Sequence, residues 1–118
     1  MKQHTTPEQT AKLIELGFEK PKSIENMMPQ PVVDGYVHLV PQKAYSIGEL
    51  IEMLPTMIGE GDFNGEPLFK YSFVLAGATK WIVGYEFFAK FNQYVSEREE
   101  LIDALYEMVV KLKEEGVI

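Results

Sequence analysis

The sequence contains no cysteine, and this absence excludes several kinds of site at once. Without thiols the chain forms neither a disulfide nor a cysteine-bearing zinc site, and it has no thiolate nucleophile. No apolar run approaches the roughly 20 residues that a membrane-spanning helix needs. The first residues, MKQHTTPEQT, lack the apolar core of a signal peptide. By elimination we expect a cytoplasmic protein that has no membrane partner.

Positive charge is also scarce, because 11 Lys and Arg stand against 18 Asp and Glu, for a net charge of −7. The basic residues form no cluster that would overcome the repulsion of a phosphate backbone, so direct nucleic-acid binding is disfavoured. The simplest interpretation of the negative charge is solubility. An acidic protein can nevertheless bind a basic groove on another protein.

Signatures of catalysis and of metal binding are missing as well. No GxSxG, Walker-type or dinucleotide-binding motif is present. The loop Glu60–Glu66 places oxygen side chains ahead of Gly65 as a calcium loop does, but its twelfth position is Tyr71 where the bidentate Glu belongs. His4 lies near the N-terminus and His38 on a presumed edge strand, with no sign of a shared metal. We therefore assign no catalytic residue, no metal and no cofactor.

What is present is the composition of one globular domain covering residues 1–118, with 46% apolar and 25% charged residues. A first helix is expected over residues 7–16. Thr6 and Gln9 provide a capping box at its start, and Gly17 ends it.

Two further helices are indicated by their caps. Ser46 and Glu49 form a capping box at the start of SIGELIEMLP, which Pro55 ends. A long amphipathic helix is expected over Ser96–Gly116, with Ser96 as N-cap, Glu99 three residues on, and a left-handed glycine at its end. Its apolar stripe recurs at helical spacing and consists of Leu101, Ile102, Leu105, Met108, Val109 and Leu112.

Strand signals are weaker in the first half of the chain. Residues 19–31 carry three prolines and no periodicity, so neither a long helix nor a central strand is expected there. Tyr36–Val40 is typical of a short strand near an edge, preceded by a turn at Asp34-Gly35 and ended by Pro41. Residues 59–67 are expected to form the longest polar loop.

The best hairpin signal is Leu68–Phe88. With a three-residue loop at residues 77–79, Phe73 faces Val83 on an apolar side and Lys70 faces Glu86 on the other. The order of elements then predicts an α+β fold, in which a small antiparallel sheet (the hairpin plus a short strand) packs against a long C-terminal helix and two short helices.

Five residues form a candidate interaction surface. The apolar side of the expected hairpin is an aromatic face that consists of Phe69, Tyr71, Phe73, Trp81, Tyr85 and Phe87. Trp81 and Tyr85 each carry a polar atom that needs a partner, which favours a position at the rim of this face. Asp103, Glu107 and Val110 lie on the presumed exposed side of the last helix, where Glu107 is spaced to pair with a lysine at position 111. Burial of Val110 would indicate a subunit interface.

Four phrases resemble small uncharacterised proteins of bacterial prophages and related mobile elements: TPEQ…LIELGF, AYSIGELIEMLP, KWIVGYE and EELIDALYEMVVKLKEEGVI. The resemblance runs from Thr6 to Val117. That group has no established activity, so the resemblance implies no functional residue, only a small soluble accessory protein of an element living inside a bacterium.

Two readings of function follow. The leading one is a non-enzymatic protein-interaction module, whose partner is another protein or a second copy in a homodimer. The alternative is a small ligand-binding protein or enzyme with a pocket between the hairpin and a helix.

Overall fold

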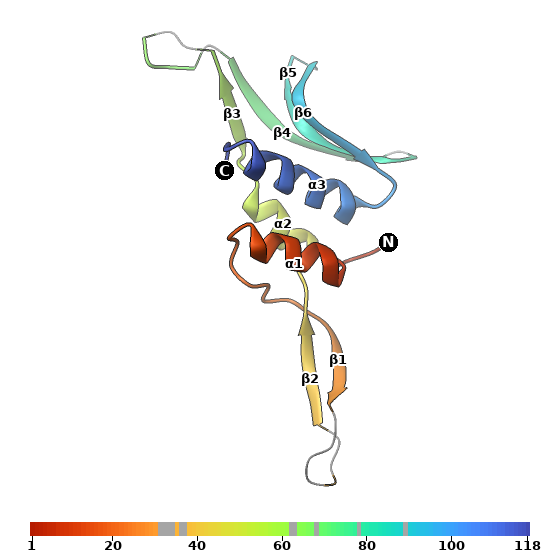
Figure 1. Ribbon diagram of the computed structural model, residues 1–118. Helices are drawn as coiled ribbons and strands as arrows, with labels where there is room; N and C mark the ends of the chain where they lie inside the picture. The colour runs from red at the N-terminus through yellow and green to blue at the C-terminus, as the bar shows by residue number, and fades with distance from the viewer. Residues whose placement is uncertain (31–34, 36–37, 62–63, 68, 78, 89) are drawn as a thin grey trace.

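The computed structural model describes residues 1–118 except 31–34, 36–37, 62–63, 68, 78 and 89 (Figure 1). It confirms the α+β class. The helices are α1 (Pro7–Glu15), α2 (Ile47–Met53) and α3 (Leu101–Glu114). The strands are β1 (Ile24–Gln30), β2 (His38–Lys43), β3 (Met57–Glu60), β4 (Phe69–Gly77), β5 (Trp81–Phe87) and β6 (Lys90–Arg98).

The strands form two separate antiparallel sheets, where the sequence indicated one. One sheet has four strands in the order β3-β4-β5-β6, and the other consists of β1 and β2 alone. The short second strand therefore pairs with β1 and does not join the hairpin. All three helices lie on one side of the four-stranded sheet, which leaves its other side open (Figure 1).

The expected starts of α1 and α2 are confirmed. Thr6 accepts from the Gln9 N–H at 3.1 Å, and the Gln9 side chain accepts from the Thr6 N–H at 3.0 Å. Ser46 and Glu49 make the same reciprocal pair at 3.2 and 3.1 Å. Each helix thus satisfies two of the N–H groups that a helix start leaves unpaired.

The expected start of the last helix is wrong, although its end is confirmed. Ser96 lies in β6 opposite Val83, and α3 begins at Leu101 without a side-chain cap. Residues 90–98 belong to a strand that pairs along the edge of β5, and this pairing overrides the capping signal. At the other end Gly116 has φ +75, and the Val117 N–H donates to the Leu112 carbonyl at 2.9 Å.

The hairpin is confirmed with a displaced register. Phe73 faces Tyr85, not Val83, and the two rings lie 5.6 Å apart. Three residues still separate the last pair, but that pair is Gly77 with Trp81, so the loop comes one residue later than expected. A Cβ at Gly77 would stand 2.7 Å from the Trp81 ring, so the absence of a side chain there allows the indole to cover this pair.

Prolines do not interrupt the first two strands as the sequence suggested. β1 includes Pro29, and β2 runs through Pro41 to Lys43. Both strands are edges of a two-stranded sheet, where proline is tolerated. The expected turn residue Asp34 and the expected strand start at Tyr36 lie outside the described residues. β3 also occupies the start of the expected polar loop.

The core is centred on α3, which lies between the four-stranded sheet and α1 (Figure 1). Its apolar stripe is buried as the sequence predicted: Leu101, Ile102, Leu105, Met108, Val109 and Leu112. From the sheet, Val83 and Tyr85 are fully buried beside it. Val83 and Tyr85 of the hairpin thus pack beside α3 in the region where the alternative reading placed a ligand pocket.

Candidate functional site: the projecting arm and its base

The two-stranded sheet projects from the helical side of the molecule as an arm, which we define as β1 and β2 (Figure 1). The strands contact each other far more than any other element. The radius of gyration is 17.8 Å, against about 13 to 14 Å for a compact domain of this length. An isolated two-stranded sheet is only marginally stable in water, so the arm depends on how its base is held.

One carboxylate, that of Glu49 in the first turn of α2, holds the base of the arm. It accepts hydrogen bonds from the backbone N–H groups of Lys22 (3.0 Å), Ser23 (3.3 Å) and Ser46 (3.1 Å), and from the Ser23 hydroxyl. Burial alone would raise the pKa of Glu49, but these donors lower it to about 2. The carboxylate therefore stays ionised and ties α2 to the segment that enters β1.

Tyr45 fastens the segment that leaves β2. Its side chain is buried, and its hydroxyl donates to the backbone carbonyl of Glu19. Its backbone N–H donates to the Thr5 hydroxyl oxygen at 3.0 Å. Burial, and secondly the charge of Glu49, raises the pKa of Tyr45, so the phenol keeps its proton. The entry to β1 is thus anchored to α2, and the exit from β2 is anchored to the segments that precede and follow α1.

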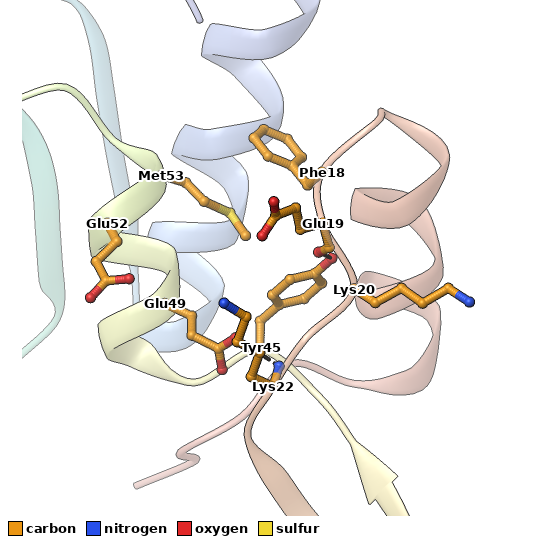
Figure 2. Close-up of a pocket in the computed structure, with 8 residues that line it drawn as sticks. All are labelled: Phe18, Glu19, Lys20, Lys22, Tyr45, Glu49, Glu52 and Met53. Carbon is orange, nitrogen blue, oxygen red and sulfur yellow. Dashed lines mark hydrogen bonds between the residues drawn. The ribbon is translucent and has the colours of Figure 1, made fainter.

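A pocket of about 230 Å³ opens beside this anchor (Figure 2). Its lining consists of Phe18, Glu19, Lys20, Lys22, Tyr45, Glu49, Glu52 and Met53. Lys20 and Glu52 extend away from the pocket (Figure 2). A general base works best with a pKa near the working pH, whereas Glu49 is strongly acidic and already accepts four hydrogen bonds. The arrangement suits an anchor better than acid–base catalysis.

A second groove of about 240 Å³ lies on α1 beside the arm's base. Pro7, Ala11 and Ile14 line it from α1, and Glu25 and Lys43 line it from the arm. Its wall is mostly small or apolar, and the two opposite charges come from the two strands.

The edges of the arm resist the addition of another strand. Pro41 lies opposite Met27, and Pro29 lies opposite Leu39. A proline fits a ladder only where its missing N–H would point away from the partner strand. Each outer edge of the arm therefore lacks a donor, which is one way natural sheets avoid edge-to-edge pairing. Binding by the arm is left to its faces.

One face of the arm is apolar and exposed. On β2, Leu39, Pro41 and Lys43 lie two residues apart and therefore on the same side of the strand. Met27 and Ile24, the partners of Pro41 and Lys43, lie on that side as well. A register shift between Ile24 and residue 26 brings Ile24 onto the side of Met27. Ile24 is 54% exposed, Met27 45% and Leu39 61%. We call the set Ile24, Met27, Leu39 and Pro41 the arm's apolar face; Val40 lies on the other side.

The four-stranded sheet also has an uncovered side, because the helices pack on one side only (Figure 1). Val83 and Tyr85 point into the core, so the residues that alternate with them face outward. The register carries this side across the sheet, and we call its apolar members the open sheet face: Met57, Val74, Ala76, Ile82, Phe91 and Val95. Met57, Phe91 and Val95 are exposed. Glu86, Glu97 and Lys70 share this side.

The structure gives the five sequence-derived surface residues different degrees of burial and different partners. Tyr85 is fully buried and its hydroxyl donates to the Pro55 carbonyl at 2.7 Å, so the expected rim position is wrong. Trp81 is half-buried against the core. Val110 is half-buried as well, where the sequence placed it on the wet side of α3.

The two acidic members of that surface are engaged in ion pairs. The Asp103 carboxylate lies 2.8 Å from Lys2 Nζ and accepts from the Gln9 amide at 2.9 Å. Burial opposes ionisation, but these donors lower the pKa of Asp103. Glu107 pairs with Arg98 at 2.7 Å, whereas the expected partner Lys111 donates to the Gln93 carbonyl at 2.8 Å. Together these contacts hold the N-terminus, β6 and α3 to one another.

Within the described part of the chain, no three His, Asp or Glu side chains come together as a metal site. His4 forms an isolated bridge with Ser46, and His38 lies in β2. Residues 62–63 of the calcium-like loop lie outside the described residues. The strand expected at Tyr36–Val40 overlaps β2 at residues 38–40, but β1 was not expected. IENM and HLVPQ lack the regular alternation of polar and apolar residues that marks a half-buried strand, so the sequence carries no clear signal for the pairing of the two strands.

No family model, curated protein or solved structure matches the chain. Among the described residues, no helix combines the length and apolar character needed to cross a bilayer.

Proposed function

We propose that this protein is a non-enzymatic protein-interaction module that acts through its arm. The observation that carries the proposal is the arm's apolar face, an exposed stripe that is mounted on a hydrogen-bonded base. Anchoring lowers the entropy that binding must overcome, because the arm is already oriented. A cytoplasmic protein of prophage or mobile-element type remains part of the proposal, and that part rests on the sequence alone.

Differential capture tests the proposal. The full chain is immobilised and incubated with a bacterial lysate that also contains a differently tagged second copy, and bound proteins are identified by mass spectrometry. We expect at least one protein to be retained by the wild type and lost with Met27→Ser/Leu39→Ser. The control is Val40→Ser, which removes an exposed apolar side chain from the opposite side of the arm. Identical captured sets from all three chains would refute a binding role for the arm's apolar face.

A further inference from the structure

We infer that the arm's apolar face docks on the open sheet face of a second copy of this chain, and that two copies exchange arms reciprocally. The inference rests on the proposed function and names its partner. Each chain has two uncovered apolar faces, the arm's apolar face and the open sheet face. If the arm of each copy docks on the sheet of the other, one type of contact made twice covers both faces on both copies. In one molecule they cannot meet, because the arm projects away from the sheet and the helices lie between them (Figure 1).

The distribution of charge supports docking of the arm's apolar face on the open sheet face of another copy. Residues 20–43 contain three lysines against Glu25 and Asp34, whereas the rest of the chain holds eight basic and sixteen acidic residues. Residues 20–43 thus carry a net charge of +1 and the rest of the chain −8. Two of the three lysines, Lys20 and Lys22, lie at the base of the arm, and β1 and β2 themselves hold one acidic and one basic residue, Glu25 and Lys43. Locally, Lys43 lies on the side of the arm's apolar face, and Glu86 and Glu97 outnumber Lys70 on the side of the open sheet face. Charges of opposite sign favour the encounter of the two faces.

The mode of contact follows from the prolines at the arm's edges. Strand addition is blocked at positions 29 and 41, so the arm docks face to face, as sheets do about 10 Å apart in sandwiches. A seven-residue, two-stranded ribbon presents a face about 24 Å long and about 10 Å wide. Two exchanged arms then bury about 1,000 Å² in total, which is the lower limit for a specific interface. One arm alone, or two arms packed on each other, would bury about half of that area.

The first measurement is the mass of the full chain by light scattering on a size-exclusion column, over concentrations from about 1 to about 500 µM, the range in which small interfaces associate. The wild type is expected to pass from 13.5 kDa to twice that mass. Met27→Ser/Leu39→Ser (arm variant) and Met57→Lys/Val95→Lys (sheet variant) are each expected to raise the dimer dissociation constant about 100-fold. Val40→Ser is expected to leave it unchanged.

Mixing the two variants decides the geometry. The arm variant retains an intact sheet and the sheet variant an intact arm, so an equimolar mixture restores one of the two contacts. The heterodimer keeps one intact contact and about half of the buried area, so we expect it to be weaker than the wild-type dimer. We also expect it to form toward the top of the concentration range, where each variant alone is still a monomer. Two arms that pack on each other would give no heterodimer and leave the sheet variant dimeric.

Circular dichroism and urea unfolding must show that both variants fold, which the exposure of all four substituted side chains favours. A wild type that stays at 13.5 kDa throughout, or a mixture without heterodimer, overturns the inference. If the capture experiment still shows arm-dependent binding of a different protein, the proposed function stands while this inference fails.

Discussion

Gly84 and Phe91 lie against each other on the open side of the four-stranded sheet. A Cβ at Gly84 would stand 2.8 Å from the phenyl ring and 3.1 Å from the Tyr94 carbonyl oxygen. The absence of a side chain at Gly84 thus lets the Phe91 ring approach the backbone of β5 closely.

Gly84→Ala is therefore expected to lower the free energy of unfolding by about 1 to 3 kcal/mol, because ring and backbone must shift. Gly48→Ala is the matched control. Gly48 lies in α2, and the nearest atom to an added Cβ there is 3.9 Å away. Alanine there should raise the free energy by about 0.5 to 1 kcal/mol. Urea denaturation measures both, and a stabilised Gly84→Ala would show that Phe91 does not pack as described.

Two serines with similar sequence surroundings are expected to respond in opposite directions to alanine. Ser46 caps α2, so Ser46→Ala should lower the free energy of unfolding by about 1 kcal/mol. Among the described residues, Ser96 Oγ is buried without a hydrogen-bond partner. Ser96→Ala removes this unsatisfied group and should raise the free energy by about 1 kcal/mol. Thermal and urea unfolding compare the pair; destabilisation by Ser96→Ala would instead favour the capping role first expected for it.

Protonation of Glu49 is expected to account for part of the loss of stability of the folded protein at acidic pH. The pKa of Glu49 falls from the ordinary 4.5 to about 2 in the folded protein. The ionised carboxylate therefore stabilises the folded state above pH 4.5, and this stabilisation is lost as the pH drops toward 2. Glu49→Gln should cost about 1 kcal/mol at pH 7, since solvent reaches the carboxylate and screens it. The variant should also show a flatter loss of stability between those pH values. Glu52→Gln, on the same helix but directed away from the pocket (Figure 2), is the control and should follow the wild type.

Tyr85 is expected to affect the stability of the folded protein at alkaline pH. Burial raises its pKa from 10.0 to about 12, so above pH 10 the unfolded chain loses this proton while the folded chain keeps it. Stability therefore declines as the pH rises through that range. Tyr85→Phe should make this decline less steep and should cost about 1 kcal/mol at neutral pH, because the hydrogen bond to the Pro55 carbonyl is lost. Tyr71→Phe serves as the control, and equal alkaline curves for all three chains would contradict the assignment.

Local signals predicted the helices well and the sheets only in part. Capping boxes at Thr6 and Ser46 involve residues three apart, so the sequence displays them directly. The capping signal at Ser96 is of the same kind, yet pairing with Val83 overrides it. Strand pairing depends on partners far along the chain, which a single sequence does not reveal. The aromatic side of the hairpin was predicted despite the displaced register, because a shift of two residues along β5 leaves every side chain on its original side.

The candidate site was predicted least. Glu49 was recognised as a capping residue, but its bonds to Lys22 and Ser23 span more than twenty residues and leave no periodic trace. The expected surface at Tyr85 failed because the phenol finds its partner inside the protein, at the Pro55 carbonyl. For the arm, an edge strand was expected at Tyr36–Val40, whereas β1 was not expected. The prolines of residues 19–31 were taken to exclude a long helix and a central strand, but an edge strand accepts proline.

The length of the arm also affects how the molecule moves in solution. The principal extents of a single chain are 68 × 34 × 17 Å. Its hydrodynamic radius is therefore larger than that of a compact protein of the same 13.5 kDa. It should diffuse more slowly and elute earlier than its mass suggests. On a calibrated size-exclusion column, the elongated shape of a monomer would then give an apparent mass close to that of a dimer. Light scattering measures the mass itself, independently of shape.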